Sequence, residues 1–179
     1  LFRSFNLFTR YYDVEVRNCL FAGAGQYAVA LTRGGGYKFL HTTIANNWYG
    51  SQRTTPSVYM NDYGVDDSGN PVSFPLYKAE FLNSIIWGNN DDELELDYKF
   101  STSIHSFRNV LLKTTLNTSG ANFTSIIKNQ NPQFNDAQSA DYGLSTNSPA
   151  LNVGNPIWLD VITQTDILGN NRSEEHTSE

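Results

Sequence analysis

The amino-acid sequence predicts an all-β protein built as a parallel β-helix, a solenoid of short strands with one long loop insertion and an irregular C-terminal cap. A phrase of ten residues recurs four times, with an apolar, strand-like centre and a fixed polar position. No segment sustains apolar residues at the spacing of a helix. Glycine, asparagine, serine and threonine also interrupt the chain too often for long helices.

The recurring phrase defines the expected strands. It reads VEVRNCLFAG at 14–23, YKFLHTTIAN at 37–46, AEFLNSIIWG at 79–88 and HSFRNVLLKT at 105–114. Its third position is always apolar and holds Val16, Phe39, Phe81 and Phe107. Apolar and polar residues alternate before the asparagine, so Val14, Val16 and Leu20 are expected to share one buried side. Coiling returns short parallel strands to the same edge, which would place the three phenylalanines one above another.

The fifth position of the phrase is a polar column. It holds Asn18, His41, Asn83 and Asn109. An asparagine at a bend between strands can donate and accept hydrogen bonds, so the column is predicted to form a ladder between neighbouring rungs. His41 keeps both a donor and an acceptor. The alternative is that these residues are ordinary turn formers in unrelated hairpins.

The spacing of the polar column sets the domain organisation. The successive spacings are 23, 42 and 26 residues, of which the first and last fit one rung of a parallel β-helix. The long middle spacing predicts an insertion at about 49–77. Rungs are therefore expected over 1–130, followed by a C-terminal cap segment over 131–171.

Composition restricts the partners of the chain. A length of 179 residues suits a single domain, and the formal net charge of −6 with no Lys/Arg cluster argues against nucleic acid. No stretch is apolar for long enough to span a membrane, and we expect a monomer. Cys19 lies beside the apolar column and is expected to be a small buried hydrophobe.

The two ends of the sequence carry separate expectations. The chain begins at Leu1 in mid-pattern, which suggests a fragment that lacks its N-terminal rungs and any signal peptide. The last eight residues, 172–179, match the translation of a common DNA sequencing-library adapter. We therefore expect that tail to be an artefact and exclude it from the reasoning about the fold.

The C-terminal part resembles a known family. From 131 onward it reads NPQFND, then DYGLSTNSPALNVGN, then DILGNNR. The matching residues are Asn131, Pro132, Phe134, Asp141, Tyr142, Leu144, Ser148, Pro149, Ala150, Asn152, Gly154, Asp166, Gly169 and Arg172. This pattern is similar to the end of bacterial right-handed parallel β-helix proteins of the choice-of-anchor Q type, in the pectin-lyase-like superfamily. The resemblance implies a right-handed β-helix at the bacterial cell surface or outside the cell, and it brings no catalytic residues.

The same segment is expected to act as a cap for physical reasons. It is dense in Pro, Gly and Asn and cannot extend a regular strand ladder. Its apolar side chains could lie across the last rung; they are Phe134, Tyr142, Leu144, Leu151 and Val153. We expect Asp166 to bond the amides of a local turn and Gly169 to supply an unusual backbone conformation.

The predicted insertion is the main candidate for a binding site. Eight residues in or near it could contact a polysaccharide: Trp48, Tyr49, Arg53, Asp62, Tyr63, Asp66, Asp67 and Trp87. The insertion also contains Tyr59. Aromatic rings stack on the apolar faces of sugars, while Asp, Asn and Arg bond sugar hydroxyls. The alternative is a solvated loop whose aromatic rings pack back on the wall of the β-helix.

The patterns that would indicate metal binding or catalysis are weaker than those for a binding site. The acidic run 89–97 offers oxygen ligands for calcium, but Leu94 and Leu96 alternate with acidic residues as in a strand with a solvated outer face. We therefore predict no metal and no cofactor. The aspartate pairs 66–67 and 91–92 lie in no catalytic motif, and no Ser-His-Asp pattern is evident.

The sequence therefore favours a non-catalytic extracellular or cell-surface domain that binds a polysaccharide or a host or matrix glycan, or that serves in adhesion. The alternative is the C-terminal part of a polysaccharide lyase or glycoside hydrolase with a pectin-lyase-like fold. Gathering of both aspartate pairs and Arg53 in one groove would favour the enzyme. Scattered carboxylates, with Trp48, Tyr49 and Trp87 exposed on one wall, would favour binding.

Overall fold

Apart from two 3-10 helices, all regular secondary structure in the described part of the chain is β-strand, which confirms the all-β prediction. The computed structural model describes residues 5–100 and 104–172, and this part contains fifteen strands, two single-turn 3-10 helices and no α-helix. The strands and short helices are β1 (Leu7–Arg10), β2 (Asp13–Arg17), β3 (Leu20–Ala22), β4 (Val29–Thr32), β5 (Gly35–Leu40), β6 (Thr43–Asn46), β7 (Val58–Asn61), β8 (Tyr63–Val65), β9 (Pro71–Ser73), β10 (Leu76–Gly88), β11 (Leu94–Asp97), β12 (Ser106–Leu112), β13 (Phe123–Lys128), β14 (Phe134–Asp136), η1 (Ala137–Ser139), β15 (Asp141–Leu144) and η2 (Pro156–Trp158).

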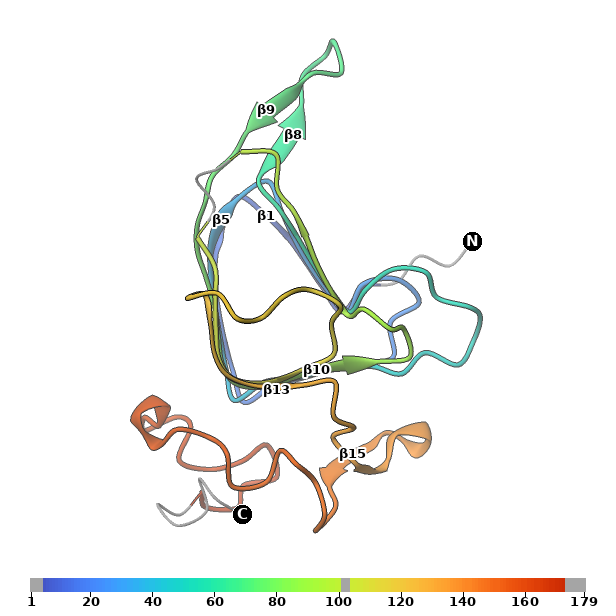
Figure 1. The fold of residues 1–179 in the computed structure, drawn as a ribbon, viewed down its shortest axis with the longest axis vertical. Helices are drawn as coiled ribbons and strands as arrows, with labels where there is room; N and C mark the ends of the chain where they lie inside the picture. Colours follow the sequence, from blue (N-terminus) through green and yellow to red (C-terminus); the bar gives the residue numbers. More distant parts are fainter. Residues whose placement is uncertain (1–4, 101–103, 173–179) are drawn as a thin grey trace.

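Two parallel sheets form the body of the molecule. We call the sheet with order β1-β4-β7-β11 sheet A, and the sheet with order β2-β5-β10-β12-β13 sheet B; β3 and β6 extend sheet B beside the second half of β10. Each neighbouring pair within these sheets is parallel. Viewed along the stacking direction, the strands trace a triangular outline (Figure 1). Strands of both sheets contribute side chains to one buried apolar cluster.

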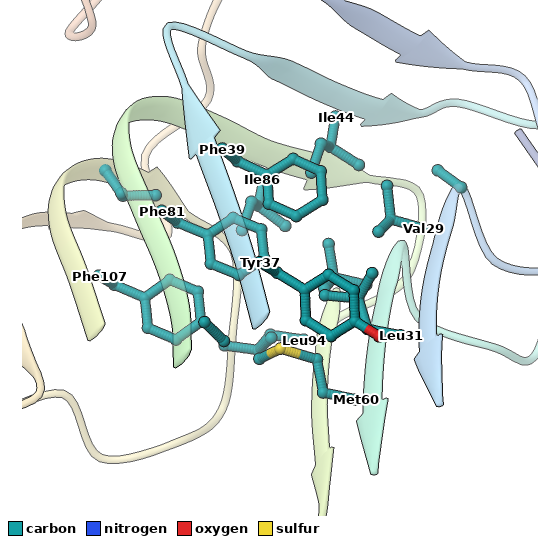
Figure 2. Close-up of a cluster of buried hydrophobic side chains, with 14 of the residues drawn as sticks. Val29, Leu31, Tyr37, Phe39, Ile44, Met60, Phe81, Ile86, Leu94 and Phe107 are labelled. Atoms are coloured by element: carbon teal, nitrogen blue, oxygen red, sulfur yellow. The ribbon is translucent and has the colours of Figure 1, made fainter. Parts of the chain in front are cut away.

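The recurring phrase aligns in sheet B with the register that the sequence predicts. Phe39 pairs with Val16 on one side and with Phe81 on the other, and Phe81 pairs with Phe107. The rings of Phe39 and Phe81 lie 4.7 Å apart between centroids, and those of Phe81 and Phe107 lie 4.8 Å apart (Figure 2). The predicted stacking of the three phenylalanines is therefore confirmed.

A fifth copy of the phrase extends this stack and was missed in the sequence. Phe123 in β13 pairs with Phe107, and their rings stack at 5.2 Å. The signal was present as FTSII at 123–127, which repeats the spacing of FRNVL at 107–111 in β12. Ser125 takes the position of the polar column in this copy, which is why the asparagine pattern did not show it.

The polar column marks a bend in every copy of the phrase. Asn18, His41, Asn83 and Asn109 have φ angles between 45° and 53°, and Ser125 has 54°. Asparagine tolerates this left-handed conformation better than most residues, which explains its recurrence. The bend also shifts the alternation of side chains. Leu20 is therefore 39% exposed while Phe21 packs against the core, so the prediction that Leu20 shares the side of Val16 is wrong.

The predicted insertion at 49–77 is not a single loop. It contains β7, which pairs with both β4 and β11 inside sheet A, and its residues Val58 and Met60 are fully buried. Two excursions flank this strand: a loop over 47–57 and the antiparallel hairpin of β8 and β9. Figure 1 shows the hairpin projecting from one corner of the triangle and the loop from another. β7 contains too few apolar residues for a local sequence pattern to predict a strand there.

The C-terminal segment lies elsewhere than the sequence suggested. It runs outside the triangle along the outer face of sheet B (Figure 1), instead of across β13. The chain between β12 and β13 crosses the triangular outline in the same view, and its Leu116 packs against the core. The side chain of Lys128 donates to the backbone oxygen of Leu116 at 2.6 Å. Residues 173–179 of the suspected adapter tail lie outside the described residues, and Arg172 lies within them.

Two loops of the sequence type D-x-x-G-N share one turn structure. The carboxylate of Asp166 accepts from the amides of Leu168 and Asn170, both at 2.8 Å, and Gly169 has φ of 85°. The expected roles of Asp166 and Gly169 are therefore confirmed. Asp66 at the tip of the β8–β9 hairpin bonds the amides of Ser68 and Asn70 in the same way.

Candidate functional site

The structure divides the eight predicted site residues between two corners of the molecule. Trp48, Tyr49, Arg53 and Trp87 belong to the corner of the 47–57 loop, whereas Asp62, Tyr63, Asp66 and Asp67 belong to the hairpin corner (Figure 1). Sheet A runs from one corner to the other. The eight residues therefore do not form one site.

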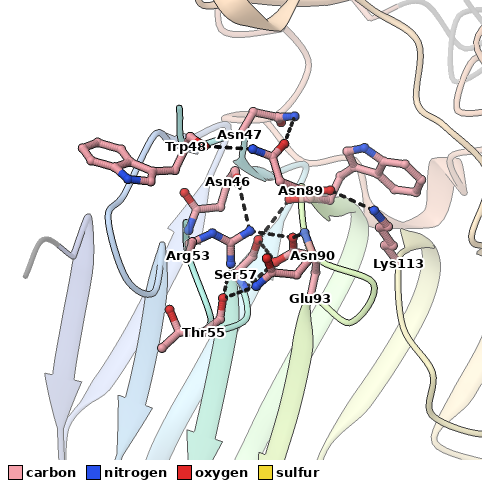
Figure 3. A network of polar contacts seen from close by, with 12 residues as sticks. Asn46, Asn47, Trp48, Arg53, Thr55, Ser57, Asn89, Asn90, Glu93 and Lys113 are labelled. Carbon is pink, nitrogen blue, oxygen red and sulfur yellow. Dashed lines mark hydrogen bonds and ion pairs between the residues drawn. The ribbon is translucent and has the colours of Figure 1, made fainter. Parts of the chain in front are cut away.

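Arg53 is a structural residue of the loop corner. Its guanidinium donates to Glu93 at 2.6 Å and to the backbone oxygen of Asn46 at 3.0 Å (Figure 3). The other carboxylate oxygen of Glu93 accepts from the amide and the hydroxyl of Ser57, both at 2.7 Å. The side chains of Arg53 and Glu93 are 1% and 0% exposed. These groups bind one another within the fold, and their side chains offer almost no exposed surface to a ligand.

The aromatic residues of this corner pack largely on their own surroundings. The indole nitrogen of Trp48 donates to the Ser51 hydroxyl at 3.1 Å. The backbone oxygen of Trp48 accepts from the side-chain amide of Asn89 at 2.9 Å. The ammonium of Lys113 lies 5.0 Å from the ring centroid of Trp87. Tyr49 is the most exposed of the three aromatic residues, at 60%.

The predicted acidic residues are held by local hydrogen bonds. Asp62 is buried and accepts from the amides of Lys99 and Phe100 at 2.8 and 3.1 Å. The hydrogen bonds from Asn70 lower the pKa of Asp66. Asp92 accepts from the hydroxyl of Thr114 at 2.9 Å and lines a hollow of about 620 Å³ together with Arg53. Asp66 and Asp67 lie outside that hollow, so the two aspartate pairs are not gathered in one groove.

The polar column binds the C-terminal segment. Asn83 exchanges two hydrogen bonds with the backbone of Asn155, at 2.8 and 3.0 Å. Asn18 donates to the backbone oxygens of Ile162 and Thr165, and Asn109 donates to that of Val153. The predicted contact between rungs is limited to a 3.4 Å approach of the Asn83 amide to His41. The column thus holds a strap across sheet B, with a cavity of about 860 Å³ beneath it.

Acidification is expected to weaken this attachment. Burial beneath the strap, together with the charge of Arg172, lowers the pKa of His41 from 6.5 to about 4. As the pH falls, the His41 imidazole is therefore protonated in the unfolded chain before it is protonated in the folded protein. The contribution of neutral His41 to the stability of the folded state is full above pH 6.5 and is lost as the pH falls toward 4. We expect the melting temperature of the native protein to fall more steeply over this range than that of His41→Asn. Parallel melting curves for the two proteins would contradict this assignment.

A strip of aromatic rings covers the outer face of sheet A. Phe8 contacts Phe5 with ring centroids 5.2 Å apart, Phe5 stacks on Tyr27 at 5.9 Å, and Tyr27 contacts Tyr59 at 5.1 Å. Phe5 and Phe8 are 38% and 45% exposed. We name Phe5, Phe8, Tyr27 and Tyr59 the aromatic strip.

The strand register explains how the aromatic strip is positioned. Phe8, Ala30, Tyr59 and Glu95 occupy one column across the four strands of sheet A. Side chains alternate along a strand, so this column points outward while Leu31 and Met60 point into the core. Ala30 is only 1% exposed although it lies on the outer face. Neighbouring rings cover the small residue, and the strip is continuous.

On β11, next to the last ring of the aromatic strip, the outward side chains are carboxylates. The hydroxyls of Tyr59 and Tyr63 both donate to one oxygen of Asp97, at 2.7 Å each. Glu95 lies two residues away on the same outward face and also lines the 620 Å³ hollow. Burial raises the pKa of Glu95, and the charges of Asp97 and Asp92 act in the same direction. This end of the strip is therefore electrostatically negative.

Sequence reasoning found only the edge of this site. Of the residues named in the predicted insertion, Tyr59 belongs to the strip, and Tyr59 and Tyr63 both donate to Asp97 at its acidic end. Phe5, Phe8, Tyr27, Glu95 and Asp97 were missed as binding residues, because the strands of sheet A lie outside the recurring phrase. The available signal was weak: one outward aromatic residue in each of two short strands, Phe8 in β1 and Tyr59 in β7.

Comparisons with known proteins give no identification. No family model, curated protein or solved structure matches the chain. In the described part of the chain, no helix combines the length and hydropathy needed to cross a membrane. Residues 5–100 and 104–172 also contain no cluster of three His, Cys, Asp or Glu side chains arranged to hold a metal ion.

Proposed function

We propose that the chain is a right-handed parallel β-helix of the pectin-lyase-like type. Parallel strands that follow one another in register through sheets A and B support this proposal, as does the column of stacked phenylalanines. Crossover connections between parallel strands of one sheet are almost always right-handed, which gives the hand. From its resemblance to choice-of-anchor Q proteins, we also propose that it lies outside a bacterial cell or on its surface.

We further propose that it is a non-catalytic glycan-binding domain and that the aromatic strip is its binding face. The observation that supports this most directly is the unbroken contact of four rings across three neighbouring strands, β1, β4 and β7, and the segments beside them. A row of rings offers successive apolar faces to the successive sugars of a polymer. The carboxylates of Glu95 and Asp97 beside the row can accept from sugar hydroxyls.

The position of the strip fits a surface function. Phe8 and Tyr59 stand on strands of a parallel sheet, and Phe5 and Tyr27 lie in the segments just before β1 and β4. At the two strand positions little conformational entropy is lost when a ligand binds. The rings of Tyr27 and Tyr59 are also held by their neighbours, and Tyr59 is fixed further by its hydrogen bond to Asp97. A prearranged row of this kind favours extended, repetitive ligands over compact ones.

The test is glycan binding by single-ring variants. We expect the native protein to bind a subset of polysaccharides on a glycan array, and Phe8→Ala to reduce affinity about fivefold or more, since loss of one stacking ring costs about 1 kcal/mol. Tyr49→Ala serves as the matched control because Tyr49 is 60% exposed and lies in the 47–57 loop, outside the strip. Absence of binding to every glycan, or an equal loss in both variants, would refute the proposal.

A further inference from the structure

We propose that the aromatic strip selects polymers of positively charged amino sugars over their neutral or acidic counterparts. This inference rests on the proposed function and adds the class of ligand. It is carried by the placement of Glu95 and Asp97 at the end of the strip, in register with the rings.

The register places a carboxylate where the next ring of the strip would stand. Glu95 pairs directly with Tyr59, so the two outward side chains are neighbours across about 4.8 Å of sheet. A sugar stacked on Tyr59 therefore presents its ring substituents to Glu95. An ammonium substituent would face a carboxylate there and would also lie near the ring faces of Tyr27 and Tyr59, which attract cations.

Asp97 supplies a second acceptor on the same face. Asp97 pairs with Asn61, as Glu95 pairs with Tyr59, and lies two residues farther along β11. Its two tyrosine hydrogen bonds fall on one oxygen, Oδ2. The other oxygen, Oδ1, takes neither of these hydrogen bonds and can accept from an ammonium group.

The cations near the strip do not neutralise this end. Lys99 lies over the ring of Tyr63, with its nitrogen 4.1 Å from the centroid. Arg10 lies over Phe8, 4.8 Å from its centroid, at the opposite end of the sheet. Arg53 is buried in its ion pair with Glu93. Two carboxylates, those of Glu95 and Asp97, thus lie on this face beside one lysine, an arrangement that attracts amines and repels uronic acids.

The experiment compares hexamers of glucosamine, N-acetylglucosamine and galacturonic acid by calorimetry in low salt, at a pH where the amine is protonated. We expect the glucosamine hexamer to bind about fivefold or more tightly than the N-acetylglucosamine hexamer, because each exposed charge contact is worth up to about fivefold. The galacturonic acid hexamer should bind most weakly. The preference for glucosamine should shrink as salt is added.

Glu95→Gln separates this inference from the proposed function. The variant should lose most of the glucosamine preference and keep its affinity for the N-acetylglucosamine hexamer. Asp67→Asn removes an exposed carboxylate at the distant hairpin tip and should change neither. Equal binding of the glucosamine and N-acetylglucosamine hexamers by the native protein would overturn the amino-sugar selectivity and leave glycan binding intact. Binding of none of the three hexamers would overturn the selectivity too, and the glycan array would then decide the proposed function.

Discussion

Replacing Glu93 by alanine is expected to lower the free energy of unfolding by about 3–5 kcal/mol, because it leaves the charge of Arg53 buried and unpaired. Both side chains are almost wholly inaccessible to solvent, and the carboxylate also accepts from the amides of Ser57 and Asn90. For a chain of 179 residues, this loss corresponds to a melting temperature about 6–20 °C lower. Thermal and urea unfolding would measure it.

Two companion variants identify the cause. Glu15 forms ion pairs with Arg17 and Lys38 at the surface, where its side chain is 46% exposed, so Glu15→Ala should cost about 1 kcal/mol or less. The double variant Arg53→Met with Glu93→Leu removes both charges together and should recover much of the lost stability. A Glu93→Ala protein as stable as Glu15→Ala would show that the ion pair does not hold this corner.

The second large effect is expected for Phe81→Ala, which should destabilise the protein by about 3–5 kcal/mol. The ring of Phe81 is fully buried between those of Phe39 and Phe107, at 4.7 and 4.8 Å (Figure 2). Its removal opens a cavity in a continuous stack, and neighbours held by the strand register cannot close it. Chemical denaturation would give the change in free energy.

Phe8→Ala is the matched control for this substitution. The side chain is also a phenylalanine on a parallel strand, but it is 45% exposed on the outer face of sheet A. We expect a change of about 0.5 kcal/mol or less in the free energy of unfolding. Similar losses in Phe8→Ala and Phe81→Ala would mean that the phenylalanine stack is not the main apolar core.

The strands of sheet B could be predicted because one pattern specifies them repeatedly. Each copy of the phrase combines an inward apolar residue with a polar residue at a left-handed bend, so errors in one copy are corrected by the others. Even Leu20 was misplaced only because the bend reverses the alternation. Sheet A offers no such repetition: its outward column reads Phe8, Ala30, Tyr59 and Glu95.

The functional residues were harder to predict because their partners are distant in the chain. Forty residues separate Arg53 from Glu93, and 72 separate Asn83 from Asn155. Local composition marks Arg53 as a polar loop residue whether its charge is paired inside the protein or exposed to solvent. Only the stacking of the strands shows that its charge is neutralised inside the protein, and that Tyr59 belongs to a row of rings.

The left-handed bends have a consequence for how the protein tolerates change. Equivalent bends are separated by as few as 16 and as many as 42 residues, yet the pairing on both sides keeps the same alignment. The alignment of each copy of the phrase with its neighbours is thus independent of the length of chain that connects it to the copy before. Foreign peptides grafted at 66–70, the tip of the hairpin, should therefore be displayed without altering the levels above or below.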